Sequence, residues 1–173
     1  MLAIQNKFRF IRQGQTIVDL GAAPGSWSEL AKKFVGPSGD VFALDILPIE
    51  PIEGVKTIQG DFTEVSVYRA LWSQLAELEK KVDVVISDMA PNMSGILVSD
   101  QARSIMLVEM ALDFAEESLK SEGCFLTKIF QGAGIDSVFL RLKSSFSIVK
   151  TIKPAASRPE SREIYVLAQG FRT

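Results

Sequence analysis

Four aspartates of this sequence stand at or near the ends of apolar runs, and the first of these runs leads into a glycine-rich turn. The four are Asp19, Asp45, Asp61 and Asp88. Carboxylates in such places accept hydrogen bonds from the hydroxyl and amino groups of a ligand. One such aspartate would more often be an ordinary turn residue, but a series of them after successive strands indicates a binding site.

The turn at residues 21–25 reads GAAPG, and its composition excludes two common ligands. A phosphate-binding loop needs a lysine after its last glycine, whereas Gly25 is followed by Ser26 and Trp27. The dinucleotide fingerprint needs a glycine where this chain has Ala23, because the backbone must approach a pyrophosphate there. A small cofactor that is uncharged or cationic remains. We expect its contacts in this segment to be Asp19, Gly21, Gly25 and Trp27.

Residues after the next two strands identify that cofactor more closely. Asp45 follows the turn by about 20 residues, a position from which a carboxylate accepts both hydroxyls of a ribose. Asp61 can accept a hydrogen bond from an adenine amino group, and Phe62 can offer an aromatic face to its ring. A ribose, an adenine and a cationic amino-acid end, which an acid at a strand end could meet, together describe S-adenosylmethionine.

Apolar strands alternate with amphipathic helices along the chain. Runs such as VVIS and FLTKIF are apolar nearly throughout, which is typical of a parallel sheet covered by helices on both faces. The order of elements predicts an α/β fold with a doubly wound, Rossmann-like sheet, and ligands bind such sheets beyond the carboxyl ends of the strands. We expect strands at residues 16–20, 41–45, 55–59, 82–87, 124–130, 147–152 and 163–168.

Two helical faces and one helix start can also be read from the pattern. Apolar residues at helical spacing lie in residues 67–78 and 105–119. Ser26 and Glu29 have the spacing of a capping box, so we expect a helix to begin at Ser26.

The composition excludes several classes of function. The 173 residues are 47% hydrophobic and 23% charged, which predicts one globular domain. With no histidine and Cys124 as the one cysteine, intramolecular disulfides, imidazole catalysis and a thiolate or imidazole metal site are all excluded, and we expect no metal. Neither a membrane span nor a signal peptide is indicated, so we expect a cytoplasmic monomer.

Positive charge gathers at both ends of the chain although the net charge is −2. Residues 1–14 carry three basic residues and no acid, and residues 141–173 carry seven basic residues against two acids. This distribution indicates contact with a polyanion. In the polar loop KPAASRPESRE, the cations that we expect to meet phosphates are Lys153, Arg158 and Arg162.

Six segments of the chain resemble the FtsJ (RrmJ) family of ribosomal RNA 2'-O-ribose methyltransferases. In order, they are DLGAAPGSWS, ALDILP, GVKTIQGDF, SDMAPNMSG, KIFQG and SRPESREIY. The resemblance spans essentially the whole chain and implies a single methyltransferase domain over residues 1–173, with a mostly parallel seven-stranded sheet and one antiparallel strand near the C-terminus. It further implies methyl transfer from S-adenosylmethionine to the 2'-hydroxyl of a uridine in large-subunit ribosomal RNA.

The resemblance also implies the catalytic residues. A ribose hydroxyl is a weak nucleophile and needs a base. Lys128 matches the family's base, and the apolar residues around it could desolvate its amine. Asp88 and Glu163 match the acidic members of the same group. The family's first lysine and its basic N-terminal arm would fall just before Met1, so we expect this chain to lack them.

Other functions are less consistent with the sequence. After Asp88 the chain reads Met89, Ala90, Pro91 and Asn92, without the Pro-Pro-Tyr of exocyclic amino methyltransferases. Cytosine-5 enzymes need a cysteine next to the cofactor, and Cys124 begins its strand well before the site. A nicotinamide oxidoreductase is disfavoured because the dinucleotide fingerprint needs a glycine where this chain has Ala23. The remaining alternative is a catalytically impaired RNA-binding or ribosome-assembly protein that keeps the cofactor fold.

Overall fold

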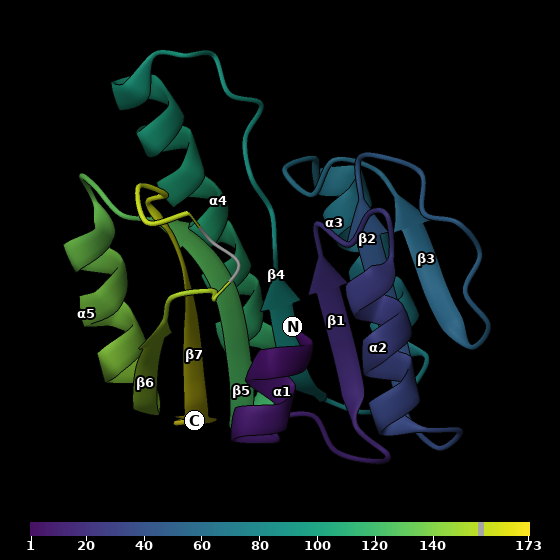
Figure 1. Cartoon of the computed structure of the whole chain (residues 1–173). Coiled ribbons are helices and arrows are strands. Elements are labelled where there is room, and N and C mark those ends of the chain that lie inside the picture. Colours follow the sequence, from purple (N-terminus) through teal and green to yellow (C-terminus); the bar gives the residue numbers. More distant parts are fainter. Residues whose placement is uncertain (156–157) are drawn as a thin grey trace. The chain divides into compact units, whose positions relative to one another are not determined.

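The computed structural model describes residues 1–155 and 158–173, which form two compact units, Met1–Ile86 and Ser87–Thr173 (Figure 1). The first unit runs through α1 (Leu2–Phe8), β1 (Thr16–Leu20), α2 (Ser26–Val35), β2 (Asp40–Asp45), β3 (Val55–Gln59), α3 (Val65–Ala76) and β4 (Val82–Ser87, whose last residue begins the second unit). The second unit continues with α4 (Leu97–Ser118), β5 (Leu119–Phe130), α5 (Ile135–Ser145), β6 (Phe146–Ile152) and β7 (Glu163–Phe171).

The strands of the first unit follow the order β3-β2-β1-β4. β1 pairs in parallel with β2, and β2 pairs in parallel with β3, so that Leu20 lies beside Leu44 and Leu44 beside Ile58. All five residues of β1 are buried, as expected for a strand inside a covered sheet. Because the three strands are parallel and their last residues lie side by side, the segments that follow them leave the sheet at the same edge.

The strands of the second unit follow the order β5-β7-β6, and β7 runs antiparallel to both of its neighbours. α4 packs against β5, and α5 packs against β6. Aromatic rings join these strands: Phe125 stacks on Phe146 with 6.4 Å between ring centroids, and Phe146 meets Phe171 at 5.4 Å. Such ring pairs contribute more stability than the burial of their apolar surface alone, and they stabilise the packing of β5 in this unit.

The predicted α/β fold is confirmed, including the seven strands and the antiparallel β7. β5 is longer than predicted and begins at Leu119, because its first part carries exposed polar residues that an apolar pattern cannot reveal. α1 was not predicted, since seven residues give too few turns for a periodicity. α3 ends at Ala76, so Leu78 lies outside the helix although the apolar spacing continues.

α2 begins at Ser26 as predicted, but no capping box forms. Gly25 is the N-cap residue, and no side chain caps the helix. The Glu29 carboxylate instead pairs with Lys33 at 2.9 Å on the helix surface.

None of the helices in residues 1–155 and 158–173 is long and apolar enough to cross a membrane. In the same residues, no cluster of three or more histidine, cysteine or acidic side chains could hold a metal ion.

Candidate active site

The glycine turn after β1 is fixed to the end of β2 by its backbone. The N–H groups of Gly21 and Ala22 both donate to the Leu44 carbonyl, at 2.9 and 3.1 Å. Gly21 has φ 74° and Gly25 has φ 119°, a left-handed conformation that glycine adopts at little cost. A Cβ on Gly25 would also lie 2.9 Å from the Ile52 side chain. The sequence needs glycine at this position for both reasons.

Asp19 supports the turn from inside the first unit. Its side chain is fully buried, and it accepts a hydrogen bond of 2.6 Å from the Ser28 hydroxyl in the first turn of α2. This bond ties α2 to β1 next to the turn. The structure thus gives Asp19 a supporting position, and its predicted contact with the cofactor stays a prediction. Trp27, also predicted as a contact, is half-buried at the start of α2.

Asp45 joins the turn to the end of β2 through both of its carboxylate oxygens. Oδ2 accepts the Ala23 N–H at 2.9 Å, and Oδ1 accepts the Leu47 N–H at 2.9 Å. The side chain is half-buried, and a carboxylate offers about four acceptor positions. Asp45 can therefore hold the turn and still accept hydrogen bonds from a ligand.

Asp61 and Phe62 follow β3 at the same edge of the sheet. Oδ1 of Asp61 accepts from both the N–H and the hydroxyl of Thr63, at 2.9 and 2.7 Å, and no hydrogen bond among the described residues uses Oδ2. Phe62 is 3% exposed, and its ring lies 5.6 Å from that of Tyr68. The structure leaves an acceptor on Asp61 but buries the ring that was predicted to stack on adenine.

The groups around the turn suit a cationic nucleoside better than a phosphate. Of the nearest lysines on α2, Lys32 donates to the carbonyls of Gly36 and Gly39, and Lys33 pairs with Glu29. Among the described residues, neither lysine is therefore held ready for a phosphate, whereas Asp45 and Asp61 keep acceptor capacity. This chemistry fits the ribose hydroxyls and the adenine amino group of S-adenosylmethionine.

In the second unit, Lys128 and Asp88 form a partly buried ion pair. Lys128 Nζ lies 3.2 Å from Asp88 Oδ1 and also donates to the Asp88 carbonyl at 3.2 Å. The Lys128 side chain is 11% exposed and that of Asp88 is 32% exposed. The Phe130 ring lies 5.9 Å from the same amine. The predicted desolvation of Lys128 is thus present, and its amine keeps a fixed position beside a carboxylate.

Tyr165 completes this group and was not predicted from the sequence. Its hydroxyl donates to Asp88 Oδ1 at 3.0 Å. Burial raises the pKa of Tyr165 well above its usual value, and the negative charge of Asp88 raises it further. Tyr165 therefore stays a hydrogen-bond donor at neutral pH. Its place two residues after Glu163 was the available signal, because alternate residues of a strand share a face.

Strand register explains why these side chains meet. Lys128 lies directly opposite Tyr165 in the antiparallel pair of β5 and β7, and Phe130 lies opposite Glu163. Residues that are opposite in such a pair share a face, so all four side chains lie on one face near the end of β5. Glu163 is half-buried there and raises the pKa of Tyr165 through its charge. We call Lys128, Asp88, Tyr165 and Glu163 the acid–base cluster.

The segment after Asp88 is held by a buried aspartate of α4. Oδ1 of Asp100 accepts from the Ser94 hydroxyl at 2.7 Å and the Ser94 N–H at 2.9 Å, and Oδ2 accepts from the Gly95 N–H at 3.0 Å. Arg103 pairs with the same carboxylate at 2.6 Å. The loop that leaves the acid–base cluster is therefore fixed to the start of α4.

This arrangement predicts a pH-dependent stability. The hydrogen bond from the Ser94 hydroxyl is the largest cause that lowers the pKa of Asp100, to about 2. Since an unfolded aspartate has a pKa of about 3.9, the stabilisation is complete above that value and is lost as the pH falls through about 2. We expect Asp100→Asn to lower the free energy of unfolding at neutral pH, and the difference from the wild type to shrink in acid. Urea denaturation at several pH values measures this, and a difference that stayed constant down to the acid limit would contradict it.

The predicted RNA-contacting cations lie in or beside the β6–β7 connection. Lys153 and Arg158 are exposed, and Lys153 donates to the Ser161 carbonyl. Arg162 is exposed and donates to the Gln131 carbonyl at 3.4 Å. No ion pair of Arg162 with Glu163 is present among the described residues, so Glu163 is not merely its surface partner. Residues 156 and 157 of the predicted loop lie outside the described residues.

The sequence of the chain is similar to those of known methyltransferases. A family model of FtsJ-like methyltransferases matches residues 1–171. The ribosomal RNA large subunit methyltransferase E of Alkalilimnicola ehrlichii is 54% identical over 171 residues, which are 99% of this chain and 81% of that protein.

Two solved structures extend the comparison to the fold. A Plasmodium falciparum protein described as a ribosomal RNA methyltransferase is 26% identical, with a TM-score of 0.85, and the match covers 98% of this chain and 93% of that one. Fibrillarin of Aeropyrum pernix, solved with S-adenosyl-L-methionine bound, is 15% identical with a TM-score of 0.60, over 91% of this chain and 67% of that one. The likeness to fibrillarin concerns the fold alone.

Proposed function

Because the chain belongs to the FtsJ-like methyltransferase family, as its sequence motifs predicted, we propose that it methylates ribosomal RNA with S-adenosylmethionine. More closely, the acceptor is the 2'-hydroxyl of a ribose, on a uridine of the large ribosomal subunit. The observation that carries this proposal is the acid–base cluster, in which a partly buried amine lies beside a carboxylate. A weakly acidic hydroxyl needs such a base, and this chain has no histidine to supply one.

The first unit supplies the residues that would hold the cofactor. Asp45 would accept hydrogen bonds from the ribose hydroxyls, and Asp61 would accept one from the adenine amino group. The turn at residues 21–25 would let the backbone approach the cofactor, while the hydrogen bond between Asp19 and Ser28 holds α2 next to the turn. When bound, S-adenosylmethionine supplies a methyl group on a sulfonium centre, which is a good leaving group. We propose Asp88 and Trp27 as further contacts.

The second unit supplies the proton chemistry. Lys128 takes the proton of the ribose hydroxyl as that oxygen becomes a nucleophile. Asp88 orients the Lys128 amine, and the Tyr165 hydroxyl bonds the same Asp88 oxygen. When the amine is neutral, the carboxylate therefore still has a donor and is not left bare in a partly buried place. Glu163 lies on the same face and positions the amine or the ribose.

The RNA substrate would be recognised through its 2'-hydroxyl and its phosphates. RNA is selected over DNA because DNA has no 2'-hydroxyl. Lys153, Arg158 and Arg162 meet phosphates of the RNA. Because one family model extends over residues 1–171, we propose that both units act as one methyltransferase domain, which works as a monomer in the cytoplasm.

Asp45→Ala is expected to weaken the binding of S-adenosylmethionine by about a hundredfold or more. The variant removes hydrogen bonds to two ribose hydroxyls, and a hydrogen bond to a charged group contributes about 1.5–3 kcal/mol. Isothermal titration calorimetry measures the affinity. Asp40→Ala is the matched control, because Asp40 lies at the opposite end of β2, where its carboxylate pairs with the exposed Lys80 at 3.6 Å. An unchanged affinity in Asp45→Ala would remove Asp45 from the cofactor site.

The reaction itself is tested with tritium-labelled S-adenosylmethionine and undermethylated large ribosomal subunits. Label should enter the RNA, and digestion to nucleosides should release 2'-O-methyluridine. Label in a base instead of a ribose would refute the proposed acceptor. No incorporation by a protein that binds both cofactor and RNA would favour the alternative, a catalytically impaired RNA-binding or ribosome-assembly protein.

A further inference from the structure

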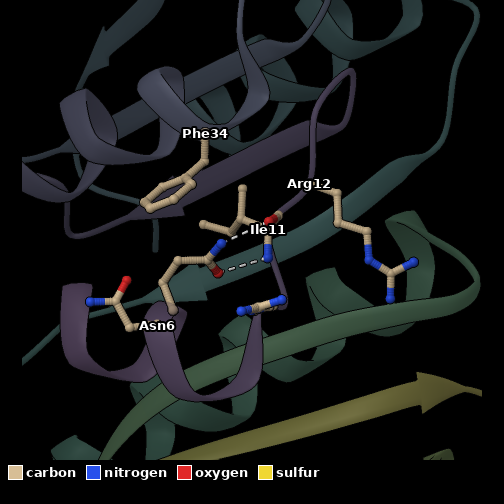
Figure 2. Close-up of a pocket in the computed structure, with 6 residues that line it drawn as sticks. Asn6, Ile11, Arg12 and Phe34 are labelled. Atoms are coloured by element: carbon tan, nitrogen blue, oxygen red, sulfur yellow. Dashed lines mark hydrogen bonds between the residues drawn. The ribbon is translucent and has the colours of Figure 1, made fainter.

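A pocket of the first unit lies where α1, the segment after it and α2 meet (Figure 2). Its volume is about 620 Å³, within the range of roughly 300–1,000 Å³ that is usual for small-ligand sites. In Figure 2, the labelled Asn6, Ile11, Arg12 and Phe34 are drawn around it. The complete lining is Gln5, Asn6, Arg9, Ile11, Arg12 and Phe34. We call it the α1–α2 pocket.

A buried glutamine shapes this pocket. The Gln5 side chain donates to the Ile11 carbonyl at 2.7 Å and accepts the Ile11 N–H at 2.9 Å, as the dashed lines in Figure 2 show. Gln5 is 3% exposed and Ile11 is 3% exposed, so both bonds are shielded from water. Arg9 ends α1 in the left-handed region, with φ 49°, and its N–H donates to the Gln5 carbonyl at 2.7 Å. The segment that carries the two arginines is thus held in one fixed conformation.

The charge of the pocket is positive and not neutralised. Arg9 and Arg12 are both exposed, and within the described part of the chain neither guanidinium forms an ion pair. No acid occurs before Asp19, and Lys7 adds a third exposed cation on α1. Guanidinium groups in such a setting bind phosphate oxygens well, because each presents several donors in a fixed plane.

The remaining lining suits the other parts of a nucleotide. The Phe34 ring on α2 is half-buried, and an aromatic face stacks on any base. The exposed Asn6 amide lines the same pocket and offers both a donor and an acceptor to a base edge. The pocket thus combines groups that suit an unpaired nucleotide: two arginines for its phosphates, an aromatic ring for its base and an amide for the polar edge of that base.

The α1–α2 pocket is distinct from the cofactor turn. Phe34 lies near the end of α2 and Trp27 at its start, which is a separation of about 10 Å along the helix axis. From this geometry we propose that the pocket binds one unpaired nucleotide of the RNA substrate, away from the nucleotide that is methylated. The identity of the strand as ribosomal RNA rests on the proposed function, but the pocket and its chemistry do not.

The double variant Arg9→Ala/Arg12→Ala tests this proposal through binding alone. Fluorescence anisotropy with a labelled single-stranded oligouridylate should show affinity reduced about tenfold, since two phosphate contacts are lost. The slope of log K against log salt should fall by about 1.4, because each contact to a single strand contributes about 0.7. Methyl transfer is measured separately, so a failure of the proposed reaction would not be mistaken for a failure of the pocket.

A matched control removes the same charge from elsewhere in the first unit. Arg69→Ala/Lys81→Ala also deletes two exposed cations, outside the α1–α2 pocket. This control should keep most of the affinity and nearly the whole salt slope. The proposal is overturned if both double variants lose affinity equally, since that would indicate a diffuse attraction, or if the pocket variant binds like the wild type. Circular dichroism confirms that each variant is folded.

Phe34→Leu tests the stacking contribution. Leucine keeps the apolar packing of α2 but removes the aromatic face, so affinity should fall about fivefold or more with an unchanged salt slope. A variant with wild-type affinity would show that the pocket holds only phosphate. Competition with uridine monophosphate distinguishes binding of an RNA strand from binding of a free nucleotide. Weak competition supports binding of the strand. Full displacement of the oligonucleotide at a low concentration of the monophosphate would overturn the proposal.

Discussion

Replacing Lys128 by methionine is expected to lower the rate of methyl transfer by about 10²- to 10⁴-fold, while S-adenosylmethionine still binds. Methionine has a similar length and removes the amine, so the proton of the ribose hydroxyl has no acceptor. The packing around it should survive, because Asp88 keeps the hydrogen bond from Tyr165 at 3.0 Å. Single-turnover transfer of the tritiated methyl group, with calorimetry of cofactor binding, measures both quantities.

Two further variants make the Lys128 result specific. Lys143→Met removes the same charge from the exposed surface of α5 and should leave the rate unchanged. Lys128→Arg keeps a cation beside Asp88 but cannot lose its proton at neutral pH, so it should be nearly as slow as the methionine variant. If Lys128→Arg transferred methyl groups at the wild-type rate, the amine would serve only as a positive charge, and the role of base would have to be given up.

Asp88→Asn is expected to reduce methyl transfer about 100-fold. The Asp88 carboxylate is bonded by both the Lys128 amine and the Tyr165 hydroxyl, so its charge fixes the position of the base. A misplacement of about 1 Å in a catalytic group can cost about 10²-fold in rate. The effect should appear in kcat, and the double variant with Lys128→Met should be no slower than Lys128→Met alone, because the two residues act as a unit.

The control for Asp88→Asn is Asp136→Asn, at the exposed first turn of α5. It removes the same charge from the second unit without touching the acid–base cluster. Its rate should equal that of the wild type. A double variant in which the losses of Asp88→Asn and Lys128→Met simply multiplied would contradict the pairing of these residues in one catalytic unit.

The sequence alone determined the strands and the residues at their ends. Thr16–Leu20 and Val82–Ser87 have the predicted bounds, because a strand buried on both faces is apolar along nearly its whole length. Val55–Gln59 also has the predicted bounds, although none of its residues is fully buried. The glycine turn was equally readable, since Gly21 and Gly25 occupy conformations that few other residues adopt. Motif resemblance indicated the family and pointed to Lys128, Asp88 and Glu163.

Only the tertiary structure decided which of these side chains meet and which are buried. Tyr165 joins Asp88 across 77 positions of the chain, a contact that depends on the register of β7 against β5 and not on any local pattern. Asp19 and Phe62 are both buried in the first unit, which depends on what packs over each residue, and their contacts with the cofactor stay predictions. The α1–α2 pocket follows from the same cause: Gln5 and Ile11 are six residues apart, and their two hydrogen bonds exist only in the folded chain.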